Sequence, residues 1–486
     1  MNSLTTPIIG LLVAVFVLIF LSVRTKVHPI IAMLIAACIT GISGGMTTDE
    51  TLKAITNGFG STLGNIGIVI GLGVMLGRIL EVSGAAEKIA FTFIQWLGKR
   101  KEEWALSLTG FIVSIPIFAD SAFVILYPIS KAMAAKGQRN VITLGVALAG
   151  GLIVSHTLVP PTPGPLGAAQ LYGVDIGAMM IFGILLGIPC MASFVWYAKW
   201  LEKNFSYTEN NSKQEAATDV NNLQKNLPGF SISLFPIVIP IFLIFLKALT
   251  NIMPAPSSEM GTVIFQLFNF VGSPIIALSI GTLVATYTLV KNLDRHSTSV
   301  RLEEGLQSAG IILLVTGAGG ALGAVVRDSG TGSQIANLIV TSPISPIMLP
   351  FIVSTVIRFV QGSATVACIT SASITAPILS QFPDLNMLIA AQSTVVGSFF
   401  FSYFNDSLFW IVSRMMGVVD VKQQLLTWSI PTTIAWAVGG IIIAVLNLIV
   451  GARGTLLDPL LPLFVLGVVF LIIRFKGKTT SDKIVV

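Results

Sequence analysis

Continuous apolar runs of about 20 residues recur along the whole chain, and this pattern limits the folds that are open to it. Each run is long enough to cross a lipid bilayer as one α-helix. Of the 486 residues, 54% are hydrophobic and only 10% are charged, whereas a soluble domain carries roughly 25% charged residues. A soluble enzyme, a disordered chain and a coiled coil are therefore excluded. The sequence predicts an all-α protein that crosses the bilayer many times.

Positive charge is concentrated in short polar segments between the apolar runs. Clusters of Lys and Arg follow the first run at Arg24 and Lys26, and others lie at residues 99–101, within 199–228 and at 474–483. Cytoplasmic loops carry an excess of Lys and Arg, so we assign these clusters to the cytoplasm. This predicts a plasma-membrane protein, in a bacterium an inner-membrane protein, with the N-terminus outside and the C-terminus cytoplasmic. The net charge of +6 then reflects orientation and gives no indication of nucleic-acid binding.

Two apolar segments have the features of re-entrant hairpins. Residues 104–135 are flanked by basic clusters at both ends and are interrupted at 115–121 by a proline and polar residues. Two full crossings would need about 40 residues plus a turn, so we predict that this segment enters the membrane part-way and returns. Residues 343–383 are its counterpart, with the tip at 361–365, and are predicted to enter from the outside.

The sequence contains an internal repeat. His28-Pro29-Ile30 resembles Ser273-Pro274-Ile275, and Gly71-Leu72-Gly73 resembles Gly317-Ala318-Gly319, at an offset near 245 in both cases. We predict about five spanning helices and one hairpin in each unit; an odd number of crossings inverts the second unit, which gives about 11 crossings with a last helix. The expected divisions are the first inverted repeat at 1–205, a polar cytoplasmic linker at 206–229, the second inverted repeat at 230–450, and a last transmembrane helix with a basic cytoplasmic tail at 451–486.

The apolar helices are interrupted at four places, two in each unit: residues 120–121, 155–165, 361–365 and 402–407. Unwound backbone leaves N–H and C=O groups that lipid cannot satisfy, and corresponding breaks in two repeats indicate the binding site of a secondary transporter. Glycine lets the backbone approach a ligand, and hydroxyl groups suit a polyhydroxylated one. We therefore predict a binding site at mid-membrane, with substrate contacts from Ser121, Thr162, Gly362, Ser363, Thr365, Asn405 and Ser407.

Charged residues inside apolar segments are costly and usually functional. Asp120 and Asp406 each lie at a break and are candidates for proton coupling, with a structural helix cap as the alternative for each. His156 is a third candidate, with a buried, hydrogen-bonded histidine as the alternative. Arg358 is a candidate ligand for a substrate carboxylate, which Arg can bind bidentately. The alternative for Arg358 is a structural pair with an aspartate.

Nothing in the sequence indicates ATP hydrolysis or a metal centre. It has no Walker motif, nucleotide fingerprint or zinc pattern, and its three cysteines lie in apolar stretches without metal-ligand spacing. An integral membrane enzyme would need a catalytic cluster at one membrane face, whereas these polar residues fall at mid-span breaks. We therefore predict no enzyme activity and no cofactor, with H⁺ as the coupling ion and Na⁺ as the alternative.

Several motifs at these breaks resemble the gluconate permease (GntP) family of the ion transporter superfamily. They lie at 158–166 with His156 just upstream, at 316–321, at 361–367 and at 405–410, and the resemblance runs from roughly residue 26 to 450. It implies proton-coupled import of gluconate and related sugar acids, with D-serine in one branch. It also implies a transport domain that contains the hairpins and slides past a scaffold that is often dimeric, so we expect a homodimer in the lipid bilayer.

Two departures from the family pattern leave the exact substrate open. The first hairpin tip reads Ala119-Asp120-Ser121-Ala122, where the family usually has an aromatic residue, an acidic residue and then Val-Gly, and Tyr403 stands where His is often found. The expected function is a proton symporter for a small anionic hydroxy acid, with gluconate, glycerate and other aldonates all compatible. A Na⁺-coupled carboxylate or D-amino-acid carrier is the alternative, followed by a membrane enzyme or a channel.

Overall fold

The computed structural model describes residues 5–97, 101–137, 140–204, 207–208, 227–250, 258–291, 294–339, 345–451, 453–476 and 484–485. Most of the predicted linker 206–229, part of the cluster at 99–101 and most of the basic tail lie outside the described residues. The described chain is almost entirely helical, as the sequence predicts, with one short parallel strand pair, β1 (Tyr207–Thr208) and β2 (Ile484–Val485).

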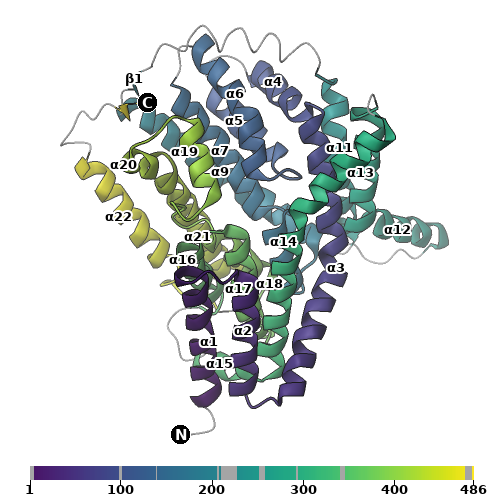
Figure 1. Ribbon diagram of the computed structural model, residues 1–486, viewed down its shortest axis with the longest axis vertical. Helices are drawn as coiled ribbons and strands as arrows, with labels where there is room; N and C mark the ends of the chain where they lie inside the picture. Colours follow the sequence, from purple (N-terminus) through teal and green to yellow (C-terminus); the bar gives the residue numbers. More distant parts are fainter. Residues whose placement is uncertain are drawn as a thin grey trace.

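The helices divide into two series along the chain (Figure 1). The first series is α1 (Thr5–Arg24), α2 (Pro29–Ser43), α3 (Thr48–Val82), α4 (Ala85–Leu97), α5 (Glu102–Val113), α6 (Ala119–Gly137), α7 (Val141–Leu158), α8 (Pro163–Leu171) and α9 (Ile176–Asn204). The second is α11 (Phe230–Thr250), α12 (Glu259–Val271), α13 (Pro274–Leu289), α14 (Arg295–Asp328), α15 (Thr331–Ile339), α16 (Met348–Gln361), α17 (Ala364–Leu379), α18 (Met387–Gly397), α19 (Ser407–Met415), α20 (Val421–Gln424), the π-helix η2 (Leu425–Ser429), α21 (Ile430–Val450) and α22 (Leu460–Lys476).

Helix boundaries fall at equivalent positions of the two sequence repeats. Both α2 and α13 have proline as their first residue, where its missing N–H costs nothing. The long helices α3 and α14 both end at a serine, and the glycines that follow, Gly84 and Gly330, have φ of 73° and 71°. Because glycine adopts positive φ without strain, each ends its helix and turns the chain. The order of elements therefore matches, whereas the inverted orientation of the two units stays a prediction.

Among the described residues, six helices are long and apolar enough to cross a membrane by length and composition: α3, α7 with α8, α9, α11, α14 and α20 to α21. The pair α12 and α13 passes the same test together but bends by 68°. Other apolar helices, including α16, α17 and α18, have only 10–17 residues. Such helices are too short to cross alone, and the predicted total of about 11 crossings is not tested by these lengths.

A break between helices lies at or beside each of the four predicted interruptions, although Asp120 and Ser121 themselves lie in the first turn of α6. Residues 114–118 separate α5 from α6, and 159–162 separate α7 from α8. Gly362 and Ser363 separate α16 from α17, and 398–406 separate α18 from α19. Proline at 116, 160 and 161 lacks a backbone donor, and Gly362 has φ of 82°, outside the helical range. Three of the four breaks therefore arise from local backbone limits, whereas the fourth contains neither proline nor glycine.

The long helices α3 and α14 lie side by side along much of their length (Figure 1). Gly58 and Gly320 face each other: a Cβ on Gly58 would lie 2.5 Å from the Gly320 carbonyl oxygen. Small residues of this kind let the backbones of membrane helices approach closely. Here they join the first repeat to the second.

Gly58→Ala is expected to destabilise the protein, because the atom that it overlaps is backbone and α14 must shift. We expect about 1–3 kcal/mol, the usual range for overpacking. Gly60→Ala is the matched control, since nothing lies within 4 Å of a Cβ at this position of the same helix. Thermal unfolding in detergent should separate the two variants; equal melting temperatures would show that α3 and α14 do not depend on this close approach.

Candidate functional site

A cavity of about 450 Å³ lies where three of the four helix breaks meet, the first, third and fourth. Helices α6, α7, α14, α16, α17 and α19 contribute to its wall, so both sequence repeats form it. The lining comprises Phe118, Ala119, Asp120, Ile153, His156, Ile311, Ile312, Val315, Arg358, Gly362, Ser363, Ala364, Thr365, Val366, Asn405, Asp406, Ser407 and Leu408. The volume falls within the range of small-molecule sites.

Arg358 and Asp406 form an ion pair at this cavity. Arg358 Nη2 lies 2.7 Å from Asp406 Oδ2, and the side chains are 2% and 12% exposed. The Ser402 hydroxyl also donates to Oδ2, while Oδ1 accepts from the backbone N–H of Leu408 at 3.3 Å. Asp406 is therefore the N-cap of α19 as well as the partner of Arg358. A helix cap was the alternative role for Asp406, and a pair with an aspartate was the alternative for Arg358. Both are present, and both residues line the cavity.

Asp120 connects the first hairpin to α19. The hydroxyl of Ser407 donates to Asp120 Oδ2 at 2.8 Å. Since Ser407 directly follows Asp406, the two predicted carboxylates are linked through two adjacent residues of one segment. His156, near the end of α7, contacts Phe118 edge-on with ring centroids 5.7 Å apart. The three candidate proton carriers thus line one cavity.

The tip of the second hairpin is tied to the fourth break. Asn405 Nδ2 donates to the carbonyl of Phe359 at 3.1 Å and to that of Val360 at 3.3 Å, and the Tyr403 hydroxyl donates to the Phe359 carbonyl at 2.6 Å. These bonds satisfy carbonyls at the C-terminal end of α16, which the left-handed turn at Gly362 leaves exposed. Ser363 then begins α17 as its N-cap and accepts from Val366 N–H at 3.3 Å.

Three helices begin at the cavity wall. The lining includes Asp120 in the first turn of α6, Thr365 in the first turn of α17 and Ser407 at the start of α19. The first N–H groups of a helix lack intrahelical partners, and the helix dipole places partial positive charge there. Together with the Arg358 guanidinium, these helix starts make the cavity suitable for an anion.

Some polar atoms in the wall have no hydrogen-bond partner among the described residues. They are Arg358 Nε and Nη1, His156 Nδ1 and Asn405 Oδ1. Buried polar groups without partners are unfavourable, so a ligand that both accepts and donates hydrogen bonds would stabilise this arrangement. A carboxylate with neighbouring hydroxyl groups has that chemistry. The alternative of a fully hydrogen-bonded His156 is not what this structure shows.

The structure brings together most of the predicted substrate contacts but places two of them elsewhere. Thr162 is buried and its hydroxyl donates to the Val159 carbonyl at 2.6 Å, within the turn before α8. Thr162 does not line the cavity, because the turn around the prolines uses its side chain locally. Ser121 lines a separate 250 Å³ cavity beside the Arg78 and Glu304 ion pair. It is one residue beyond Asp120 on a helix, and therefore faces another direction.

Several other residues of the wall could not be selected from the sequence. Phe118, Ile153, Ile312 and Val315 belong to the apolar part of the wall. An apolar residue beside a break is indistinguishable in sequence from one that faces lipid. Ser402, which holds Asp406, was visible only as part of the fourth break. Its own position is fixed by Trp428, whose indole N–H donates to the Ser402 hydroxyl at 2.8 Å.

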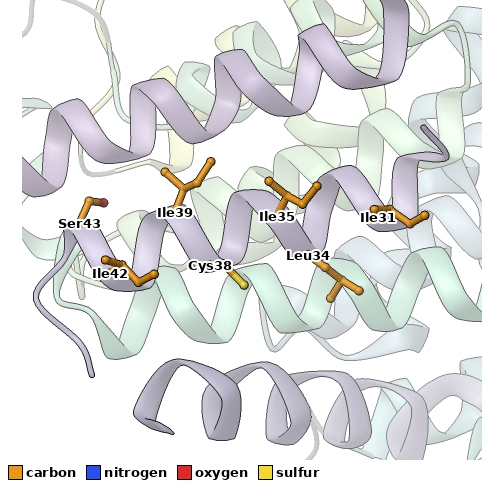
Figure 2. A pocket seen from close by; sticks show the side chains of 7 residues that line it. All are labelled: Ile31, Leu34, Ile35, Cys38, Ile39, Ile42 and Ser43. Atoms are coloured by element: carbon orange, nitrogen blue, oxygen red, sulfur yellow. The ribbon is translucent and has the colours of Figure 1, made fainter. Parts of the chain in front are cut away.

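A second hollow, on α2, has a different chemistry (Figure 2). Its volume is about 530 Å³, and all of its lining side chains come from this one helix: Ile31, Leu34, Ile35, Cys38, Ile39, Ile42 and Ser43. The Ser43 hydroxyl already donates to the Thr40 carbonyl at 3.2 Å. With no charged group in its wall, this groove does not suit a polar solute and has the character of a lipid-facing surface.

Paired broken helices that meet around a buried, charged cavity, inside an apolar helical body, define a membrane transporter. The solved structure of MtrF from Neisseria gonorrhoeae, described as an antimetabolite efflux pump, has this fold. It superposes with a TM-score of 0.62 at 15% sequence identity, over 90% of this chain and 99% of that one. At this identity the comparison shows the fold alone.

Sequence comparison identifies the family. Residues 6–449 match the GntP family permeases. A relative from Haemophilus influenzae, described as an uncharacterized permease, is 57% identical over 98% of this chain and all of its own length. A gluconate permease of Pseudomonas aeruginosa is 34% identical, covering 90% of this chain and 97% of its own. The Gnt-II system L-idonate transporter of Escherichia coli is 30% identical, covering 89% and 97%.

The chain belongs to the GntP permease family, as the motifs at its helix breaks predict. It is a multi-span membrane permease and not an enzyme, and the family is one of bacterial transporters of small acids.

Proposed function

We propose that this protein is a secondary active symporter that imports gluconate or a closely related sugar acid together with protons. The observation that carries the proposal is Arg358, a guanidinium that is 2% exposed, lines the cavity and has two nitrogens without a partner among the described residues. A buried cation with spare donors favours an anionic ligand. The named functions of the gluconate and L-idonate transporters agree with this choice.

The cavity offers different groups to the two ends of a sugar acid. Arg358 and the first turns of α17 and α19 would hold the carboxylate. Ser363, Thr365 and Asn405 line the same wall and would bind hydroxyl groups. The apolar side chains of Ile312 and Val315 would face the carbon chain. Glycerate would leave part of this 450 Å³ cavity unfilled, which favours a longer aldonate.

Proton coupling is supported by the balance of charge around the cavity. The cavity is lined by two carboxylates, Asp120 and Asp406, and by one arginine, Arg358. Adding a substrate anion without a proton would place excess negative charge in a buried site, which is unfavourable. Asp120, Asp406 and His156 are the candidate carriers. Na⁺ coupling at the same carboxylates is the alternative.

The remaining parts of the proposal concern the membrane. We place the protein in the bacterial inner membrane with its N-terminus outside and its C-terminus in the cytoplasm, on the basis of the basic clusters. The two sequence repeats would have inverted topology, with 230–450 inverted relative to 1–205. A homodimer would supply the scaffold past which the hairpins move. Cysteine accessibility at both termini in intact cells would test the orientation.

Uptake of labelled gluconate into proteoliposomes tests the proposed function. Under an inward proton gradient we expect accumulation above the external concentration, collapse with a protonophore, and competition by L-idonate. Accumulation that follows a Na⁺ gradient at constant pH would replace the proton with Na⁺. Equilibration without accumulation would indicate a channel, and an absence of competition by any sugar acid would overturn the substrate class.

A further inference from the structure

We infer that Trp428 is a positioning residue of the binding site, although it does not line the cavity. Its indole N–H orients the Ser402 hydroxyl toward Asp406, and Asp406 in turn sets the orientation of the Arg358 guanidinium. The inference rests on the proposed function, because it takes Arg358 as the ligand of the substrate carboxylate. It gives the π-helix η2, which supplies none of the described residues in the cavity wall, a role in substrate binding.

Asp406 determines how Arg358 faces the cavity. Arg358 Nη2 donates to Asp406 Oδ2 at 2.7 Å, and the Nε and Nη1 atoms have no hydrogen-bond partner among the described residues. The guanidinium is planar and its donors point in fixed directions. A shift of the Asp406 carboxylate therefore changes the direction of the two unpartnered nitrogens, which remain for a ligand.

The indole of Trp428 fixes the direction of the next hydrogen bond. An indole N–H only donates, and that of Trp428 donates to Ser402 Oγ at 2.8 Å. The hydroxyl proton of Ser402 is donated to Asp406 Oδ2, the oxygen that also binds Arg358. Without the indole the Ser402 hydroxyl would be free to rotate, and Asp406 would lose a fixed donor to Oδ2.

The backbone of Ser402 is held by the same region. Its N–H donates to Thr432 Oγ1 at 3.2 Å, and its carbonyl accepts from the Ser429 hydroxyl. Ser402 is 1% exposed and Trp428 is fully buried. Three bonds from η2 and the first turn of α21 therefore fix one residue of the fourth break.

Phe401, directly before Ser402, shows why such anchoring is needed. It has φ of 34°, a left-handed conformation that a bulky side chain rarely adopts. Strained backbone of this kind persists where the surrounding structure fixes it, and it is concentrated at functional sites. The bonds at Ser402 supply that constraint. The break is therefore held in a conformation that its own residues do not favour.

The π-helix that carries Trp428 has a local cause. The Ile430 N–H donates to the Leu425 carbonyl, five residues earlier. Pro431 lacks the N–H that an α-helix would direct to the Thr427 carbonyl, so the wider turn loses little at this position. Such π-turns are rare in helices and are frequent at functional sites. The position of η2 beside the fourth break agrees with a role in the binding site.

Trp428→Phe tests this role, because it keeps a buried aromatic ring and removes the indole N–H. Ser402→Ala removes the hydroxyl that this N–H orients, and the double variant completes a cycle. Trp436→Phe is the matched control. Trp436 lies on α21, is 1% exposed and donates its indole N–H to the Thr355 hydroxyl at 2.8 Å, and neither of these residues lines the cavity.

Gluconate and L-idonate binding would be measured by calorimetry on the purified full-length chain. We expect Trp428→Phe and Ser402→Ala each to raise the Kd about tenfold, the usual effect of one hydrogen bond to a charged group. The double variant should bind no more weakly than the weaker single variant, because both changes break one chain of hydrogen bonds. Trp436→Phe should stay within about twofold of the wild-type Kd. Its melting temperature should nevertheless fall as far as that of Trp428→Phe, since both lose one buried hydrogen bond and the same ring volume.

Increases in Kd that multiply in the double variant, or an equal loss of affinity in Trp428→Phe and Trp436→Phe, would overturn the inference. Should Trp428→Phe fail to fold, benzothienylalanine at position 428 replaces the N–H by sulfur and keeps the shape of the ring. It should show the same rise in Kd, and wild-type affinity would remove the role of the N–H. A wild-type protein that binds neither sugar acid would instead overturn the proposed function.

Discussion

Arg358→Gln is expected to reduce sugar-acid binding and uptake at least about 100-fold. The variant removes the buried cation that faces the cavity and leaves Asp406 without its charged partner. Removing one member of a buried ion pair costs about 3–5 kcal/mol. At about 1.4 kcal/mol per factor of ten, a loss of this size at the substrate carboxylate exceeds 100-fold. Labelled gluconate uptake and equilibrium binding on the same preparation would measure it.

Arg414→Gln is the control, because Arg414 is a second arginine within an apolar segment. It lies near the end of α19, is exposed, and stacks on the Trp410 ring at 5.6 Å from the ring centroid. It does not line the cavity, so we expect uptake within about twofold of the wild type, in keeping with an exposed interaction. Uptake by Arg358→Gln that matches this control would remove Arg358 from the binding site. A lowered melting temperature with unchanged affinity would mark it as structural only.

Gly362→Ala is the second variant with a large expected effect. Gly362 has φ of 82°, and a Cβ there would overlap the carbonyl of Asn405. The left-handed conformation costs a non-glycine residue about 1–2 kcal/mol, and overlap with backbone adds about 1–3 kcal/mol. The substitution would push the hairpin tip away from the fourth break and displace Ser363 from the wall. We expect both a lower melting temperature and an uptake close to background.

Gly45→Ala separates the two costs. Gly45 has φ of 89°, and nothing lies within 4 Å of a Cβ at that position. It should therefore show the conformational cost alone and keep its transport activity. Thermal unfolding and uptake, measured on both variants, would give the steric part by difference. If the two variants behave alike, the approach of Asn405 to Gly362 does not determine the shape of the site.

The helix breaks show how far local sequence reaches. Proline at 116, 160 and 161 and glycine at 362 predicted three of the four interruptions, because the backbone rules for these residues hold in any fold. The fourth was predicted from the polar residues at 402–407. Asp120, His156, Arg358 and Asp406 could be selected for a related reason: a charged or titratable group in an apolar run is costly wherever it lies. These inferences needed no knowledge of which helices are neighbours.

Contacts between distant segments could not be read in this way. Ser407 bonds Asp120 across 287 positions, and Asn405 bonds Phe359 across 46. Thr162 and Ser121 had the right chemistry at the right breaks, yet one hydroxyl turns to its own backbone and the other side chain lines a neighbouring cavity. Side-chain direction depends on the exact start of each helix, and a shift of one residue changes the face by about 100°.

The sequence by itself determined that this protein is a helical membrane protein, where its helices break, and to which family it belongs. Those properties follow from the length of apolar runs, the backbone limits of proline and glycine, and motifs at the breaks. Only the tertiary structure decided that the breaks of both halves surround one cavity, and that Arg358 is held by Asp406 through a single nitrogen. These contacts depend on the packing of six helices around the cavity, which brings together residues far apart in the chain. No local sequence pattern records that packing.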